Sequence, residues 1–298
     1  MNAKNNFLKI AMLQHSCSHD VAANEKKVHS GIKEAARQNA DLILLQELHF
    51  NTYFCQQQDA ANFDLALTIP GPSIDALRLL AKQCDIVIVA CVFEKRAQGL
   101  YHNTAVVIDN SGDIAGTYRK MHIPHDPGYN EKFYFTPGDQ GFQPIPTRLG
   151  KLGVLICWDQ WFPEAARLMA LAGADLLLYP TAIGWDPRET KDEQKRQLDA
   201  WQTIQRSHAI ANALPVIVTN RVGFEADLSK QTQGIQFWGS SFATDATGTV
   251  LSIADNAKDT LQIVDINIAD TEKHRRTWPF FRDRRTEHYS DIALRYRD

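Results

Sequence analysis

Short apolar runs rich in β-branched residues alternate along this chain with segments of helical periodicity. The runs cover residues 8–13, 42–45, 86–93, 104–108, 152–157, 175–179 and 216–219. Their length and apolar character predict buried strands. Between them, Val28, Ile32 and Ala35 share one face of a predicted helix. Ser73 could cap a second helix that continues to residue 82, and Pro163 suits the first turn of a third. This alternation predicts an α/β fold.

The last third of the chain has a different pattern. Apolar runs at 235–244, 250–254 and 261–266 are separated by turn residues, which predicts antiparallel strands and therefore a mixed sheet. No linker, low-complexity tract or short repeat divides the 298 residues, so we expect one domain over residues 1–298. Residues 270–298 form a tail rich in arginine and aromatic residues, whose composition suits an oligomer interface. Docking of this tail on its own chain is the open alternative.

Composition excludes several classes of protein. The formal net charge is -3 and the charges are scattered, so no nucleic-acid partner is expected. No apolar run reaches the roughly 20 residues that span a bilayer, and the N-terminus lacks a signal-peptide pattern, so we expect neither a membrane partner nor secretion. The 5 cysteines are odd in number and lack CxxC spacing, which argues against a disulfide framework and a zinc ribbon and favours the cytoplasm.

Three residues that follow predicted strands could carry chemistry. Glu47 comes directly after the buried run 42–45, where α/β sheets often place their sites. Lys120 precedes a long loop that also holds Tyr129 and Glu131, and loops of that length tend to be functional. Cys157 ends an apolar run before a turn and a helix, as nucleophiles of hydrolases do. The alternatives are a loop glutamate or helix cap, a solvated lysine and a structural cysteine.

Together these residue types would form an amide hydrolase. A free thiol is mostly protonated at neutral pH, and an adjacent ammonium such as that of Lys120 would favour the reactive thiolate. The Glu47 carboxylate could take the thiol proton and later give it to the departing nitrogen. Lys120 and the backbone N–H of Trp158 could stabilise the oxyanion, and one such donor is worth about 3–4 kcal/mol.

The same segments resemble the nitrilase superfamily, in which a Glu–Lys–Cys triad occurs in this chain order. The similar segments are LLQELHF, YRKMHIP, YNEKFYFTPGD and ICWDQWFPEAAR, followed by YPTAIGWDP, HAIANALPVIVTNRVG and WGSSFATDATG. The resemblance implies a four-layer αββα sandwich, homo-oligomers built from dimers, a cysteine nucleophile at Cys157 and no cofactor. It also implies a second glutamate beside the triad, which falls on Glu131.

Within the superfamily, the chain looks most like the N-carbamoylputrescine amidases. Plant members carry a glutamate in a GSEP segment where this chain has the shorter Asp186, so Asp186 is expected to contact a substrate ammonium, with Asp126 as a second acid. Related enzymes that bind carboxylates place arginines just after the cysteine, but this chain has Asp159 and Gln160 there. We therefore expect a cationic ureido substrate. The expected substrate-binding residues are Tyr129, Trp158, Trp161, Asp186 and Asp126.

Other functions are weighed against this one. A metal site from His122, His125 and Asp126 fits no standard zinc spacing, so no metal is expected. A cysteine–histidine pair between Cys157 and His208 is conceivable, although the helix-like setting of His208 favours a structural role. A related amidase for another carbamoyl compound or an ω-amide would keep the triad, whereas a non-catalytic scaffold would need a broken one.

Overall fold

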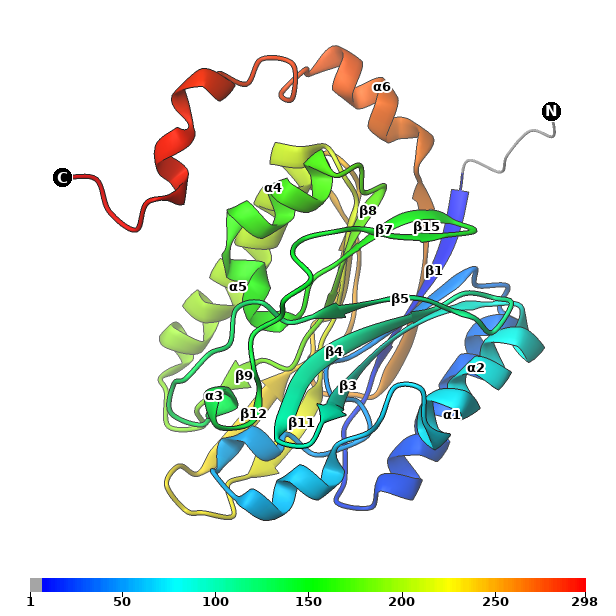
Figure 1. Cartoon of the computed structure of the whole chain (residues 1–298), viewed down its shortest axis with the longest axis vertical. Coiled ribbons are helices and arrows are strands. Elements are labelled where there is room, and N and C mark those ends of the chain that lie inside the picture. Colours follow the sequence, from blue (N-terminus) through cyan, green and yellow to red (C-terminus); the bar gives the residue numbers. More distant parts are fainter. Residues whose placement is uncertain (1–6) are drawn as a thin grey trace.

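Two six-stranded sheets face each other at the centre of this computed structural model, which describes residues 7–298 (Figure 1). The first sheet has the order β15-β1-β2-β3-β4-β5 and the second has the order β14-β13-β10-β8-β7-β6. The strands of the first sheet are β1 (Phe7–Gln14), β2 (Leu42–Leu45), β3 (Val87–Ala97), β4 (Leu100–Ile108), β5 (Ile114–Arg119) and β15 (Thr260–Asn267). Those of the second are β6 (Ile145–Thr147), β7 (Gly150–Val154), β8 (Leu176–Pro180), β10 (Val216–Thr219), β13 (Phe242–Thr244) and β14 (Val250–Ile253).

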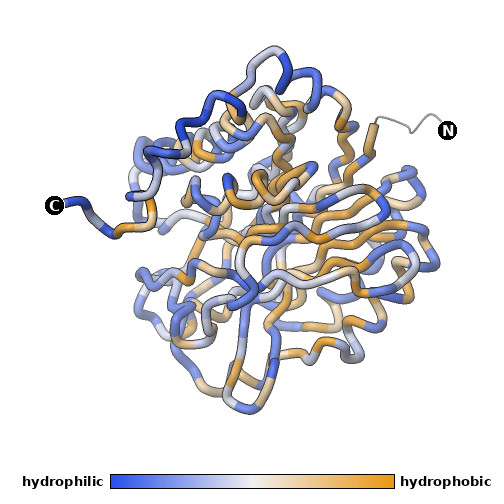
Figure 2. Tube along the Cα trace, turned by 45° about the horizontal axis from the view of Figure 1, so that its top comes forward, coloured by the Kyte–Doolittle hydropathy of each residue, from blue (hydrophilic) through white to orange (hydrophobic). Residues whose placement is uncertain are grey.

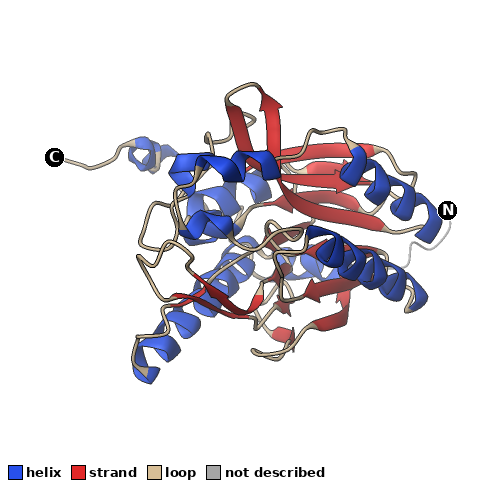
Figure 3. Ribbon diagram, turned by 90° about the horizontal axis from the view of Figure 1, so that it is seen from below, coloured by secondary structure: helices blue, strands red, loops and turns tan. Residues whose placement is uncertain are grey.

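Helices cover the outer face of each sheet, as Figures 1 and 3 show. The helices α1 (Val21–Arg37) and α2 (Pro72–Cys84) lie on the first sheet, and α4 (Pro163–Leu171) and α5 (Lys191–Asn212) lie on the second. The expected four-layer αββα sandwich is therefore confirmed. The helix predicted to begin at Ser73 begins instead at Pro72 with Gly71 as its N-cap, and the Ser73 hydroxyl donates to Glu25.

Alternation of side chains along each strand builds two cores. Met12 and Val89 point from the first sheet toward Leu178 and Ile217 of the second, in one cluster between the sheets. The sequence neighbours of Met12 and Val89 point the other way, toward the helices α1 and α2. Full burial of each aliphatic side chain stabilises the folded state by about 1.5–3 kcal/mol relative to an exposed side chain. Figure 2 shows the hydrophobic trace concentrated in the strands and the hydrophilic trace at the periphery.

The sheets are mixed, as expected. Strand β2 is parallel to β1 and β3, and β8 is parallel to β7 and β10, whereas the outer pairs are antiparallel. The carboxyl ends of parallel neighbours lie at one edge of a sheet, which is where ligands bind in such folds. The residues that follow β2 therefore lie at this edge of the first sheet, and those that follow β7 and β8 lie at this edge of the second.

The run 235–244 is not the single strand that its composition predicts. It divides into β12 (Gly234–Trp238) and β13, because Gly239 and Ser240 have positive φ angles of 52° and 55°. A side chain at Gly239 would also collide with Gln14. Strand β12 pairs with β11 (Val222–Ala226) and β9 (Gly184–Trp185) in a small third sheet, which forms one wall of the pocket described below.

The C-terminal tail lies outside the sandwich (Figure 1). Helix α6 (Ala269–Thr277) is docked, since Arg275 donates to the Asn212 carbonyl at 3.0 Å and lies over the Phe281 ring. Trp278 and Tyr296 remain 54% and 80% exposed. The tail thus contacts its own chain and also presents apolar side chains, and its packing at an oligomer interface stays a prediction. Among residues 7–298, no helix combines the length and apolarity needed to cross a membrane.

Candidate active site

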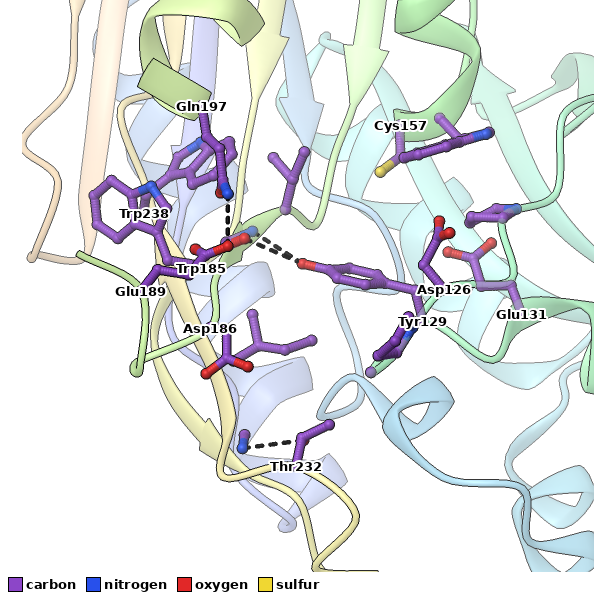
Figure 4. Close-up of a pocket in the computed structure, with 18 of the residues that line it drawn as sticks. Asp126, Tyr129, Glu131, Cys157, Trp185, Asp186, Glu189, Gln197, Thr232 and Trp238 are labelled. Atoms are coloured by element: carbon purple, nitrogen blue, oxygen red, sulfur yellow. Dashed lines mark hydrogen bonds between the residues drawn. The ribbon is translucent and has the colours of Figure 1, made fainter. Parts of the chain in front are cut away.

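A pocket of about 420 Å³ opens beside Cys157, between the carboxyl edge of the second sheet and the small third sheet (Figure 4). Its lining includes the sequence-predicted residues Asp126, Tyr129, Glu131, Cys157, Trp158, Trp161 and Asp186. The Tyr129 hydroxyl accepts the backbone N–H of Gly184 at 3.1 Å, which joins the long loop to β9. Glu47 and Lys120 lie behind this lining and are fully buried. The structure thus brings residues from four distant segments to one cavity.

A buried ion cluster lies at the inner end of the pocket. Lys120 Nζ donates to Glu47 Oε1 at 2.8 Å and to Glu131 Oε2 at 2.7 Å, and all three side chains have no exposed surface. Lys120 follows β5 directly, and Glu131 begins the short helix α3 (Glu131–Tyr134). One ammonium is shared by two carboxylates, so the cluster carries an excess negative charge unless a carboxylate binds a proton.

Two further residues fix the carboxylates, and neither was predicted from the sequence. The Tyr53 hydroxyl donates to Glu131 Oε1 at 2.6 Å, and Asn103 Nδ2 donates to Glu47 Oε1 at 2.7 Å. The other oxygen of Glu47, Oε2, is buried and has no hydrogen-bonding partner among the described residues. Glu47 is therefore held through one oxygen, while the second is free to accept a proton.

Burial dominates the protonation of this site. It raises the pKa of the Cys157 thiol well above its usual range, and the nearby Glu47 carboxylate raises it further, whereas Lys120 lowers it. Burial also raises the pKa of Glu131 to about 7 against the opposing effect of Lys120. Burial disfavours the ammonium of Lys120, but Glu131 and Glu47 hold its pKa well above its usual range. The lysine lowers the pKa of Cys157, as expected, but burial and the Glu47 carboxylate outweigh it.

The cysteine lies on a turn that the sequence did not place correctly. The predicted strand 152–157 ends at Val154, and Cys157 has a positive φ of 43° as it opens a 3₁₀ turn over Cys157–Trp161. Asp159 holds this turn: its buried carboxylate accepts the Ile156 N–H at 3.0 Å and the Tyr118 hydroxyl at 2.8 Å. The turn takes the Cys157 side chain out of the strand and to the pocket wall, where Sγ lies 3.8 Å from the Ala182 carbonyl oxygen.

The residues at positions 159 and 160 do not indicate the charge of the substrate, contrary to the interpretation of the sequence. Asp159 and Gln160 are buried outside the pocket lining, and Gln160 Oε1 accepts the indole N–H of Trp201 at 2.9 Å. The acidic residues of the pocket lining are instead Asp126, Glu131, Asp186 and Glu189, with Arg196 as the basic residue. Asp186 is already paired, because both of its oxygens accept from Arg188 Nε at 2.9 and 3.0 Å.

The histidines have structural partners. His208 Nε2 lies 2.8 Å from the Gln160 carbonyl oxygen and is buried within α5, and His122 Nδ1 lies 2.7 Å from Asp159. These contacts leave no cysteine–histidine pair at Cys157. Over residues 7–298, the histidine, cysteine and acidic side chains form no group of three or more that could hold a metal ion.

Comparison with known proteins agrees with this geometry. The carbon-nitrogen hydrolase family model matches residues 9–276. A citrullinase from Francisella tularensis is 43% identical, over 97% of this chain and 99% of that protein. An N-carbamoylputrescine amidase from Solanum lycopersicum is 40% identical over 97% and 96%. The crystal structure of a carbon-nitrogen hydrolase from Helicobacter pylori G27 superposes with a TM-score of 0.94 at 47% identity, over 98% of this chain and 100% of that one. The chain therefore belongs to the carbon-nitrogen hydrolase family of the nitrilase superfamily, and it is an amidohydrolase of the nitrilase type.

Proposed function

We propose that this protein hydrolyses N-carbamoylputrescine to putrescine, carbon dioxide and ammonia, a reaction of polyamine biosynthesis, with Cys157 as nucleophile. The observation that carries the proposal is the unpaired, buried Oε2 of Glu47 near Cys157, whose thiol pKa is raised by burial, in a pocket whose charged lining residues are mainly acidic. The 40% identical tomato relative bears this activity in its name.

Attack and proton transfer occur together in this scheme. Because burial raises the pKa of the Cys157 thiol, the free thiolate is disfavoured, and the proton passes to Glu47 as sulfur approaches the ureido carbonyl carbon. Asn103 and Lys120 hold Glu47 Oε1, so that Oε2 is the oxygen that accepts the proton. The S–C bond forms and the carbonyl oxygen becomes an oxyanion.

Lys120 supplies positive charge at that oxyanion. Its ammonium is fixed by Glu47 and Glu131, and the backbone N–H of Trp158 lies directly after the nucleophile in the turn. A preorganised donor of this kind is worth about 3–4 kcal/mol of transition-state stabilisation. Glu131 thus acts by orienting Lys120.

The remaining steps balance without a cofactor. Glu47 returns its proton to the amino group, ammonia leaves, and a thiocarbamate remains on Cys157. Water, deprotonated by Glu47, attacks this carbonyl and releases the cysteine, which regains its proton. The product carbamic acid loses carbon dioxide to give putrescine.

The pocket favours a cationic tail on the substrate. Tyr129, Trp158 and Trp161 provide apolar walls for a short alkyl chain, while Asp126 and Glu189 add negative charge to the pocket lining. These acids outnumber Arg196, the basic residue in the lining, which is itself paired with Glu193 at 2.8 Å.

The test is release of putrescine and ammonia from N-carbamoylputrescine, with Cys157→Ala as the inactive variant and Cys84→Ala as the control. Cys84 ends helix α2, away from the pocket, so its variant should keep full activity. N-carbamoyl-β-alanine and glutamine serve as comparison substrates. Activity of the Cys157→Ala protein would contradict the scheme, and activity only on a comparison substrate would contradict the substrate.

Citrulline is the second candidate substrate. It has the same ureido group but carries an α-carboxylate as well as an ammonium at the other end. The 43% identical citrullinase favours it, and Arg196 in the pocket lining is a group that could meet the carboxylate. Citrulline would yield ornithine rather than putrescine, so product analysis with both substrates at equal concentration decides between them.

A further inference from the structure

One carboxylate oxygen at the far end of the pocket has no partner. Glu189 Oε2 is shielded from solvent and makes no hydrogen bond within residues 7–298, although Glu189 lines the pocket. Its other oxygen accepts Gln197 Nε2 at 2.6 Å, which fixes the side chain. Buried polar atoms normally have partners, so an unpaired carboxylate oxygen in a pocket lining indicates a ligand group that donates to it.

Glu189 is placed to meet the end of a substrate whose other end is at the cysteine. Figure 4 shows Cys157 and Glu131 on one side of the pocket, Glu189 and Gln197 on the opposite side, and Tyr129 between them. Glu189 directly precedes Thr190, the N-cap of the long helix α5, so its backbone is anchored to the second sheet's helical layer.

The other acids of the pocket are less suited to that role. Asp186, the expected anchor, already accepts from Arg188 through both oxygens. Asp126 is exposed and pairs with Tyr129 only through its backbone. A substrate ammonium would have to displace Arg188 to reach Asp186, whereas Glu189 Oε2 has no protein partner to displace.

Aromatic rings near Glu189 favour a cation over an anion. The rings of Trp185 and Trp238 lie 5.3 Å apart, both line the pocket, and Figure 4 shows them beside Glu189 and Gln197. Indole faces attract an ammonium and repel a carboxylate. The Glu189 carboxylate and these two rings together form a site suited to one positive charge.

We propose that Glu189, held by Gln197, binds the terminal ammonium of the ureido substrate and thereby sets the preference for a cationic tail. The proposal rests on the proposed function, because it assumes that the ureido group lies at Cys157. Asp186, neutralised by Arg188, then contributes less than the sequence suggested.

The experiment compares Glu189→Gln with Asp186→Asn, two variants that each remove one charge with little change of shape. kcat/KM is measured for N-carbamoylputrescine and for N-butylurea, which has the same ureido group and alkyl chain without the ammonium. The rate at which iodoacetamide alkylates Cys157 shows whether each variant retains an intact site. Wild-type protein is measured on N-carbamoylputrescine and citrulline in the same series.

We expect Glu189→Gln to lower kcat/KM for N-carbamoylputrescine by about tenfold to a hundredfold, mainly through KM, since a hydrogen bond to a charged group is lost. Its alkylation rate and its activity on N-butylurea should stay at the wild-type level. Asp186→Asn should cost less than about fivefold, as expected for an exposed ion pair.

The inference is overturned if Glu189→Gln keeps the wild-type kcat/KM for N-carbamoylputrescine, or if Asp186→Asn lowers that kcat/KM more than Glu189→Gln does. It is also overturned if the alkylation rate of Cys157 in Glu189→Gln falls by as much as its kcat/KM. Each of these results leaves the proposed function standing if the wild type prefers N-carbamoylputrescine. A wild type that prefers citrulline instead overturns the proposed function, and the inference with it.

Discussion

Replacing Lys120 by methionine tests the electrostatics of the site most directly. Methionine keeps much of the aliphatic length but removes the ammonium that lies 2.8 Å from Glu47 and 2.7 Å from Glu131. Two fully buried carboxylates would then face each other without a counter-ion. Removing one partner of a buried ion pair costs about 3–5 kcal/mol. We expect a loss of that size in the free energy of unfolding at pH 8, together with loss of activity.

The pH dependence of this loss identifies its cause. Burial raises the pKa of Glu131 to about 7 even with Lys120 present, so without the ammonium the Glu131 carboxyl should be neutral near pH 5. When a carboxyl has a higher pKa in the folded than in the unfolded protein, the free energy of unfolding falls as the pH rises from the unfolded pKa through the folded pKa. Below the unfolded pKa nothing is lost. The penalty in Lys120→Met should therefore shrink to about 1–2 kcal/mol at pH 5, where only packing and hydrogen bonds are lost.

Urea unfolding at pH 8 and pH 5, at one protein concentration, measures both values. Lys195→Met is the matched control, because Lys195 forms an ion pair with Asp199 on the surface and is 76% exposed. It should change the free energy of unfolding by less than about 1 kcal/mol at either pH. A Lys120→Met penalty that is equal at both pH values would refute the role of uncompensated charge.

Four further variants address the support of the site. Asn103→Leu removes the donor at 2.7 Å that orients Glu47, and steady-state kinetics should show kcat reduced by about tenfold or more with KM little changed. In Glu131→Gln, urea unfolding should no longer show the wild-type loss of stability as the pH rises from 4.5 through about 7. Asp159→Asn weakens the turn at the nucleophile and should cost about 2–4 kcal/mol of stability in the same assay, whereas Tyr118→Phe, which removes one of its donors, should cost about 1 kcal/mol.

The strands were predictable where the signal is local. Runs such as 42–45 and 216–219 are uninterrupted apolar segments, and they form β2 and β10 with those bounds, because a strand covered on both faces needs apolar side chains at every position. Strand β11 (VGFEA) contains a glycine and a glutamate, and it was missed because its pairing with the next strand, β12, defines it rather than an apolar run of its own.

The site was predictable in part for the same reason. Glu47 and Lys120 could be located from their positions after strands, and the structure places them in contact. Tyr53 and Asn103 could not, since a tyrosine in a loop and an asparagine inside β4 have no pattern that indicates a distant carboxylate. The pairing of Asp186 with Arg188 was missed because two exposed residues of a loop can point in any direction.

The positions of Glu47 and Cys157, the proposed base and nucleophile, both depend on strained turns that a buried charged residue holds in place. Leu48, directly after Glu47, has a positive φ of 49°, and Cys157 has one of 43°. Such backbone costs about 1–3 kcal/mol in residues other than glycine and persists only where the surroundings enforce it. Buried Arg221 donates to the carbonyls of Glu47 and Leu48 at 3.1 and 3.0 Å, as Asp159 accepts from the turn at Cys157. Each turn directs one side chain away from the line of its strand. Arg221 and Asp159, which hold the two turns, thereby bring the Glu47 carboxylate and the Cys157 thiol to one cavity.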